Sequence, residues 1–176
     1  MTGKGIDLGR FIREVPDWPK EGILFRDITP LLADPGAFAA AVKALSAGFD
    51  DAGIEYVAAV EARGFIFGSA VAEKIGAGFV PIRKKGKLPW KTESITYDLE
   101  YGTDTLEVHS DAFRSRAKVL MVDDLLATGG TMSAACKLVE KTGGKVAGIV
   151  FLIELAALGG REKISDYEVT SDISFD

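Results

Sequence analysis

Two adjacent carboxylates, Asp123 and Asp124, stand between an apolar run and a stretch of very small residues in the segment VLMVDDLLATGG, residues 119–130. Neighbouring acids repel each other, so we expect a positive charge or hydroxyl groups opposite them. Small residues let a backbone come close to a ligand. This pattern indicates a binding site that follows directly on a buried strand.

The small residues lead into a predicted helix, and this position favours anions. The first N–H groups of a helix have no partner within it, and the helix dipole attracts negative charge. We therefore predict that the loop binds a phosphate, with the hydroxyls of its two threonines as further donors. Its residues are Ala127, Thr128, Gly129, Gly130 and Thr131. The two acids can bind hydroxyl groups or a cation, and the backbone amides next to them can bind a phosphate. A ribose 5-phosphate would suit such a site. The alternative without a binding role is a solvated turn that caps a helix.

A second segment, YVAAVEARGF (56–65), repeats the order of strand, acid, small turn and helix. Ligands of open α/β sheets bind beyond the carboxyl ends of the strands, so the two segments should meet at one edge. Arg63 is the candidate for a second anion site there. The alternative for Arg63 is a surface ion pair with Glu61.

Composition excludes several classes of function. A net charge of -5 argues against nucleic acid as a partner, because that binding needs a basic surface. The chain has one cysteine, Cys136, and one histidine, His109, which argues against zinc sites and His-based triads. There is no P-loop and no dinucleotide fingerprint. We find no signal peptide and no apolar run that could span a membrane, and expect a cytoplasmic protein.

The elements needed to position these residues follow from hydrophobic patterns. Prolines exclude a long regular helix over residues 16–35, and Asp34 then caps a helix. Apolar runs that alternate with helical patterns predict an α/β fold with a mostly parallel sheet flanked by helices. The predicted strands are 56–60, 78–82, 105–109, 118–122 and 145–155, and the predicted helices are 64–76 and 131–143. The polar stretch from Arg83 to about Ser94 reads as a long loop. We expect one domain over residues 1–176, with an irregular N-terminal region.

Several stretches together resemble the type I phosphoribosyltransferases. The segment 119–132 is similar to their phosphoribosyl diphosphate loop, in the form found in members that act on adenine. Further similar stretches extend the resemblance over about residues 15–162, and they are GILFRDITPLL (22–32), EARGFIFG (61–68), PIRKKGKLP (81–89) and YDLEYGTDTLEVH (97–109). The resemblance implies the type I fold and transfer of 5-phosphoribosyl from phosphoribosyl diphosphate to N9 of adenine, giving AMP and diphosphate.

The resemblance also assigns roles to residues. Asp123 and Asp124 would hold the ribose hydroxyls, residues 127–131 the 5'-phosphate, and Arg63 the diphosphate, with Gly64 allowing an unusual backbone. A mobile hood loop, about 84–101, would close over the substrates. Basic residues that could neutralise the diphosphate are Arg83, Lys84, Lys85 and Lys87. From composition alone, a solvated loop explains these basic residues equally well.

Three candidates depend on the resemblance. Glu100 would act as general acid or base at the purine, although by itself it reads as a turn carboxylate. The segment 15–35 would recognise the base through Phe25 and Arg26, although an aromatic residue there is more often core. Leu125 would cover the other face of the base.

The resemblance further implies Mg²⁺ held mainly by substrate oxygens, without a dedicated protein metal site, and a homodimer. No nucleic acid or membrane partner is expected. Two alternatives remain open: a transferase for xanthine or hypoxanthine-guanine, and a regulator that senses phosphoribosyl diphosphate and binds DNA. The regulator would need a DNA-binding domain and a basic face.

Overall fold

The computed structural model describes residues 6–99 and 102–176. The chain forms two compact units, Met1–Ala44 and Leu45–Asp176. The single domain expected over residues 1–176 stays a prediction.

The first unit begins with short elements. A 3-10 turn, η1 (Leu8–Phe11), precedes an antiparallel pair of strands, β1 (Arg13–Val15) and β2 (Phe25–Asp27), and helix α1 (Thr29–Ala33) follows. Helix α2 (Pro35–Ser46) begins where the sequence predicts, because Asp34 accepts a hydrogen bond from the backbone N–H of Ala37 at 2.8 Å. Between residues 16 and 35 every described element is short, as the prolines there require.

The second unit is built on a seven-stranded sheet in the order β5-β6-β4-β3-β7-β8-β9. The bounds of the strands are β3 (Tyr56–Val60), β4 (Gly78–Lys84), β5 (Thr92–Asp98), β6 (Thr103–His109), β7 (Lys118–Leu126), β8 (Lys145–Leu155) and β9 (Val169–Phe175). Strands β4, β3, β7, β8 and β9 are parallel, while β6 runs antiparallel to both β4 and β5. The predicted α/β class with a mostly parallel sheet is confirmed.

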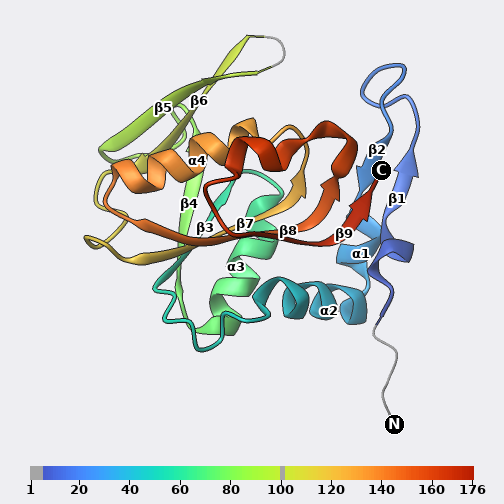
Figure 1. Ribbon diagram of the computed structural model, residues 1–176, viewed down its shortest axis with the longest axis horizontal. Helices are drawn as coiled ribbons and strands as arrows, with labels where there is room; N and C mark the ends of the chain where they lie inside the picture. Colours follow the sequence, from blue (N-terminus) through green and yellow to red (C-terminus); the bar gives the residue numbers. More distant parts are fainter. Residues whose placement is uncertain (1–5, 100–101) are drawn as a thin grey trace. The chain divides into compact units, whose positions relative to one another are not determined.

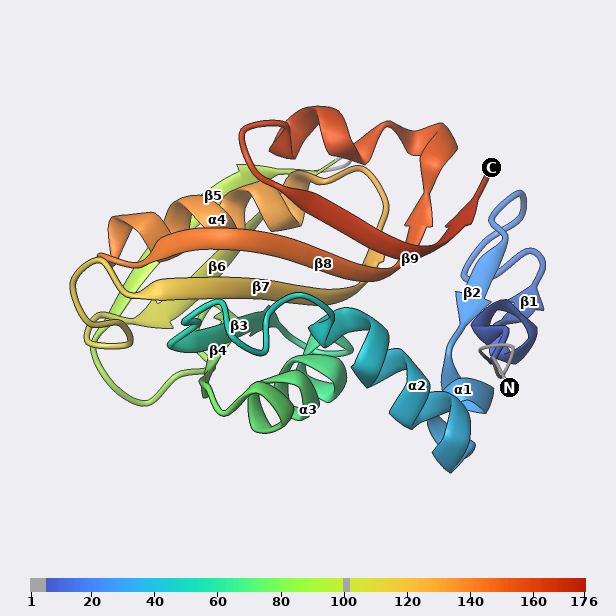
Figure 2. The same ribbon diagram turned by 60° about the horizontal axis from the view of Figure 1, so that its bottom comes forward.

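Helices cover both faces of this sheet (Figure 2). Helix α4 (Gly130–Lys141) lies on one face and α3 (Gly64–Ile75) on the other. The inner strands are apolar without alternation, and β7 is buried from Val119 to Val122. Burial on both faces explains the continuous apolar runs in the sequence.

The structure corrects three details of the sequence-based prediction. β7 continues through the acid pair to Leu126, because β8 is long enough to keep pairing with it. Thr92–Asp98, expected within the loop, forms β5 and pairs with β6. The C-terminal segment, to which no element was assigned, contributes the edge strand β9. In Figure 1, β5 and β6 form a two-stranded hairpin that extends past α4 at one end of the sheet.

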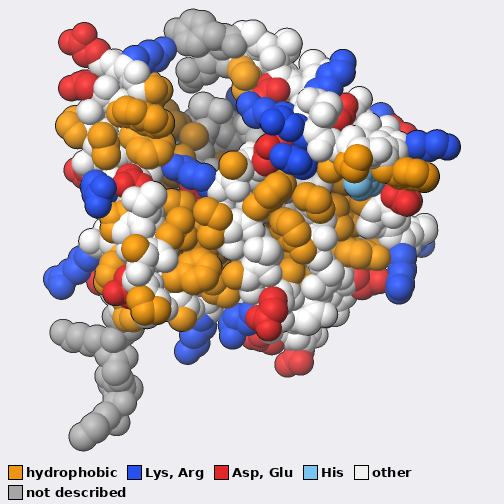
Figure 3. Space-filling model, turned by 180° about the vertical axis from the view of Figure 1, so that it is seen from behind, with side chains coloured by type: hydrophobic (Ala, Val, Ile, Leu, Met, Phe, Trp, Pro, Cys, Tyr) orange, Lys and Arg blue, Asp and Glu red, His pale blue; other side chains and the backbone are white. Residues whose placement is uncertain are grey.

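Among the described residues, no helix combines the length and apolar character needed to cross a membrane. Large hydrophobic side chains remain exposed on the second unit at Ile66, Trp90 and Leu158. Figure 3 shows hydrophobic areas on one face, interrupted by acidic and basic side chains.

Candidate active site

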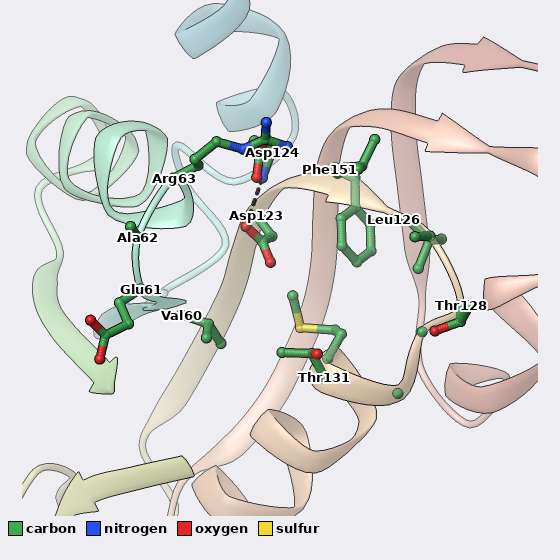
Figure 4. A pocket seen from close by; sticks show the side chains of 15 residues that line it. Val60, Glu61, Ala62, Arg63, Asp123, Asp124, Leu126, Thr128, Thr131 and Phe151 are labelled. Carbon is green, nitrogen blue, oxygen red and sulfur yellow. Dashed lines mark hydrogen bonds and ion pairs between the residues drawn. The ribbon is translucent and has the colours of Figure 1, made fainter. Parts of the chain in front are cut away.

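A cavity of about 230 Å³ lies at the carboxyl ends of β3 and β7 (Figure 4). Its walls come from two segments, the end of β3 with the turn after it and the continuous stretch from Asp123 to Met132, and Phe151 of β8 also lines it. Both candidate anion-binding segments therefore line one cavity, as expected for the carboxyl edge of a parallel sheet.

The two carboxylates of the acid pair point in different directions. Successive side chains of a strand lie on opposite faces, and both aspartates belong to β7. Figure 4 shows Asp123 directed into the cavity and Asp124 directed toward Arg63. Asp123 is half-buried, and its Oδ1 accepts a hydrogen bond from the backbone N–H of Asp124 at 2.9 Å. Asp124 is only 4% exposed.

Burial makes this pair hard to ionise. Desolvation raises the pKa of Asp123 well above its ordinary value, and the neighbouring charge of Asp124 raises it further. Desolvation also raises the pKa of Asp124, although the guanidinium of Arg63 opposes the shift. A bound cation or a set of hydroxyl donors would relieve the repulsion between the two carboxylates.

Arg63 supplies the positive charge expected opposite the acids. Its Nη2 lies 2.6 Å from Oδ2 of Asp124 in an ion pair, although this oxygen accepts no hydrogen bond of good geometry from the described residues. Glu61 pairs instead with Arg83, at 3.3 Å, and accepts the N–H of Lys84 at 2.6 Å. Burial alone would raise the pKa of Glu61, but these partners hold it below the usual value.

Gly64 has a different role from the predicted one. Its backbone is not in the left-handed region, and it begins α3. A Cβ on Gly64 would lie 2.7 Å from Oδ1 of Asp123. Glycine is needed here because the start of α3 approaches the acid pair closely.

The loop 127–131 reaches the N-terminus of α4 as predicted. Gly129 precedes the helix with φ +75°, a conformation that side chains disfavour. All five residues of the loop line the cavity, as does Leu125. The hydroxyl of Thr131 is 3.1 Å from the hydroxyl of Tyr97 on β5, so the loop also touches the β5–β6 hairpin.

The basic residues of the expected hood are partly engaged within the second unit. Arg83 and Lys84 belong to β4, where Arg83 pairs with Glu61 and Lys84 lies 3.1 Å from Asp104. Asp104 raises the pKa of Lys84. Lys87 lies in the turn that follows, and its carbonyl accepts a hydrogen bond from Arg83 at 3.2 Å.

The remaining candidates lie elsewhere. Phe25 packs edge-on against Trp18 with ring centroids 4.4 Å apart, and Arg26 is buried and paired with Glu14 across β1 and β2. Both belong to the first unit, so their role toward the cavity stays a prediction. Glu100 lies outside the described residues.

Sequence reasoning missed some residues of the site. Glu61 was considered only as a partner for Arg63, although its position beside the turn was a usable signal. Phe151 lines the cavity because it pairs with Asp123 across β7 and β8. No local pattern could have identified it, since only the register of the two strands brings it there. In the described parts of the chain, no group of three or more His, Cys, Asp or Glu side chains could hold a metal.

The parallel sheet, the acid pair and the loop at a helix N-terminus form a site that suits a sugar phosphate, and comparison with known proteins gives the class. The family described as phosphoribosyl transferase domain matches residues 31–176. The chain belongs to this family.

The similar proteins share a name that is narrower than that of the family. Adenine phosphoribosyltransferase of Pseudothermotoga lettingae is 54% identical over 170 residues, 97% of this chain and 100% of the relative. The crystal structure of adenine phosphoribosyltransferase from Thermoanaerobacter pseudethanolicus matches with a TM-score of 0.92 and 51% identity, over 96% of this chain and 98% of that one. The Saccharomyces cerevisiae enzyme, in complex with D-2,5-dideoxy-2,5-imino-altritol 1,6-bisphosphate and adenine, matches with a TM-score of 0.88 and 39% identity, over 93% and 95%. The resemblance stated from the sequence is confirmed.

Proposed function

We propose that the chain transfers the 5-phosphoribosyl group of phosphoribosyl diphosphate to N9 of adenine, forming AMP and diphosphate. The observation that carries this proposal is one cavity that joins the acid pair to a loop of backbone amides at the start of α4. The names of the similar proteins support adenine as the acceptor.

Residues 127–131 bind the 5'-phosphate in this proposal. Their amides lie at the positive end of α4, and the hydroxyls of Thr128 and Thr131 add donors. Holding the phosphate here sets the ribose above the end of β7, beside Asp123.

Asp123 and Asp124 hold the ribose hydroxyls. As the bond from C1' to the diphosphate oxygen breaks, the ribose gains positive charge, and the nearby carboxylate of Asp123 stabilises it. The N9–C1' bond then forms, and the proton of the purine nitrogen leaves to a base. Water must be kept away, because it would capture the same cation.

Arg63 binds the diphosphate. In the structure its guanidinium is paired with Asp124, so binding of diphosphate exchanges one anionic partner for another. This exchange frees a carboxylate of the acid pair for the ribose. Arg83, Lys84 and Lys87 bring further positive charge, and Arg83 is connected to the cavity through Glu61.

The residues present fit Mg²⁺ that is held chiefly by substrate. Asp123 offers a carboxylate to the cavity and Asp124 a buried oxygen without a good hydrogen bond, and hard oxygen ligands suit this ion. When bound, Mg²⁺ neutralises charge on the diphosphate as it leaves.

The base side of the site rests on the resemblance. Phe25 and Arg26 recognise the purine, Leu125 covers its face, and Glu100 takes part in proton transfer at the ring. A homodimer, a cytoplasmic location and the absence of nucleic acid partners belong to the same proposal. The hydrophobic side chains exposed on the second unit are consistent with a contact between copies.

One assay tests the function. The protein is mixed with phosphoribosyl diphosphate, Mg²⁺ and adenine, hypoxanthine, guanine or xanthine in turn, and nucleotide and diphosphate are measured. We expect AMP and diphosphate in equal amounts, with the other purines at least 100-fold slower, because a site built for one set of polar groups rejects another strongly. Product from another purine at a comparable rate would show that the acceptor is wrong, and no product from any purine would refute transferase activity.

A further inference from the structure

We propose that Arg161 is a positioning residue for the phosphate-binding loop: with Glu154 and Ser171 it holds the backbone of Gly160 against Ala127 and Gly129. We call these three side chains the Arg161 clamp. The inference rests on the proposed binding of the 5'-phosphate by residues 127–131 and adds residues that do not line the cavity.

The clamp is a closed set of strong hydrogen bonds. Nε and Nη2 of Arg161 donate to the two carboxylate oxygens of Glu154 at 2.7 and 2.6 Å. Ser171 donates to Glu154 at 2.5 Å and accepts from Arg161 at 2.9 Å. Nη1 of Arg161 donates to the carbonyl of Val169 at 2.8 Å. The clamp therefore joins β8, β9 and the short helix η3 (Gly160–Ile164).

One partner of the clamp, Glu154, is buried, while the side chain of Arg161 remains 46% exposed. Glu154 is 8% exposed, and its hydrogen bonds from Arg161 hold the pKa of this carboxyl below the usual range. A two-pronged arginine–carboxylate pair fixes orientation as well as distance. The segment between β8 and β9, visible above them in Figure 2, is thus tied down at the start of η3.

The backbone of this segment packs directly against the phosphate-binding loop. A Cβ on Gly129 would lie 3.2 Å from Cα of Gly160 and closer still to its carbonyl oxygen. In return, a Cβ on Gly160 would strike the carbonyl oxygen of Ala127 and come within 2.9 Å of Leu126. The two backbones are in direct contact, and neither can move toward the other.

The clamp is also connected to the start of the loop. Glu154 pairs with Leu126 across β7 and β8, and Leu126 is the last residue before the loop. The start of the loop is thus positioned by β8, the strand that carries Glu154. The backbone at Gly129 is positioned by Gly160, which precedes Arg161 in the chain. Amides that bind a phosphate must be held within a fraction of an ångström, so the clamp governs phosphate affinity.

Arg161→Ala and Arg161→Lys test the charge side of the inference. By calorimetry, we expect Arg161→Ala to bind AMP and phosphoribosyl diphosphate about tenfold or more weakly, while binding of diphosphate alone changes less than about twofold. Arg161→Lys keeps the charge but not the fork, so it should recover only part of the affinity. The KM for phosphoribosyl diphosphate should rise more than kcat falls.

Gly160→Ala tests the same contact without any change of charge. The added methyl group should push the loop and weaken AMP binding by a similar factor. Gly148→Ala is the matched control on β8, because its Cβ would press on Phe49 at 3.2 Å, about 20 Å along the strand from Glu154. This control should lower Tm and leave AMP affinity unchanged.

The outcomes separate the inference from the proposed function. A wild-type protein that neither binds AMP nor forms it refutes the proposed function. An active wild type whose Arg161→Ala and Gly160→Ala variants, folded by circular dichroism, keep normal AMP affinity refutes the clamp. Equal weakening of AMP and diphosphate binding also refutes it, because a merely unstable fold would affect both.

Discussion

Asp123 and Asp124 are neighbours in the chain, but β7 sends their side chains to different sides, one into the cavity and one toward Arg63. The two acids therefore have different surroundings. Asp123 can touch a ligand directly, whereas Asp124 is buried and already has an ion-pair partner. In the proposed reaction, Arg63 pairs with the diphosphate and leaves Asp124 to bind the ribose.

Asp123→Asn should lower kcat/KM for phosphoribosyl diphosphate about 100-fold or more, because a preorganised charge at the reacting ribose is lost. Asp124→Asn should act more through KM, since Arg63 loses the partner that holds it in place. Steady-state kinetics with varied phosphoribosyl diphosphate separates the two effects. Wild-type turnover in a folded double variant would show that the ribose site lies elsewhere.

Asp123→Asn should also stabilise the fold near pH 7. Burial raises the pKa of Asp123 in the folded protein, so the protonated side chain contributes to the stability of the fold. This contribution is fully present below the ordinary aspartate pKa of about 3.9. The contribution is lost as pH rises through the higher folded-state pKa. Removing the charge should therefore raise Tm at neutral pH by roughly 2 °C or more, and the gain should shrink toward pH 4. Asp51→Asn, at an exposed site, is the control and should show no such trend in thermal melts.

Glu100→Gln should reduce kcat much more than it weakens binding of phosphoribosyl diphosphate, if this carboxyl transfers a proton at the purine. A loss of about 100-fold is the size expected for a general acid or base. Single-turnover measurements isolate the chemical step from product release. An unchanged single-turnover rate would reduce Glu100 to an ordinary turn residue.

Among the elements, the β5–β6 hairpin is fastened to α4 and is not a free loop along its described length. Lys141 of α4 lies 2.8 Å from Glu93 and donates to the carbonyl of Ser94 at 3.2 Å. Nearer the site, Tyr97 meets Thr131. A closing movement of the described part of this hairpin would therefore break the contact between Tyr97 and Thr131.

Tyr97→Phe should loosen the end of β5 that is nearer the phosphate-binding loop. It removes the hydrogen bond to Thr131, worth about 1 kcal/mol, so amide exchange at residues 96–98 should speed up about fivefold. Hydrogen exchange read by mass spectrometry measures this. Thr96→Val is the control, because its hydroxyl bonds to Thr105 within the hairpin and not to α4. Equal exchange in both variants would contradict a specific anchor to the loop.

For the protein as a unit, ligand and metal should act together. Substrate supplies most of the oxygen ligands for Mg²⁺, so Mg²⁺ alone should leave Tm unchanged, and activity should vanish in EDTA. Phosphoribosyl diphosphate with Mg²⁺ at about 100 times Kd stabilises by about 2.7 kcal/mol, which should raise Tm by about 5 °C or more. Differential scanning calorimetry with each ligand alone and both together checks this. A tight Mg²⁺ site in the free protein would contradict the expectation.

The local order of residues was enough to predict the α/β class, the inner strands and the loop that leads into α4. A continuous apolar strand, two acids, small residues and a helix are all neighbours in the chain, so their pattern carries the information. The resemblance to phosphoribosyltransferases rested on the same local segments.

Tertiary structure decided what depends on distant pairing. β5 and β9 largely alternate between half-buried and exposed residues, and they form strands because β6 and β8 supply hydrogen bonds. The extension of β7 through the acid pair, and with it the separation of Asp123 from Asp124, follows from the length of β8. Phe151 enters the cavity by register, and Gly160 reaches the loop through the Arg161 clamp. Such contacts join residues far apart in sequence, and no single-sequence period records them.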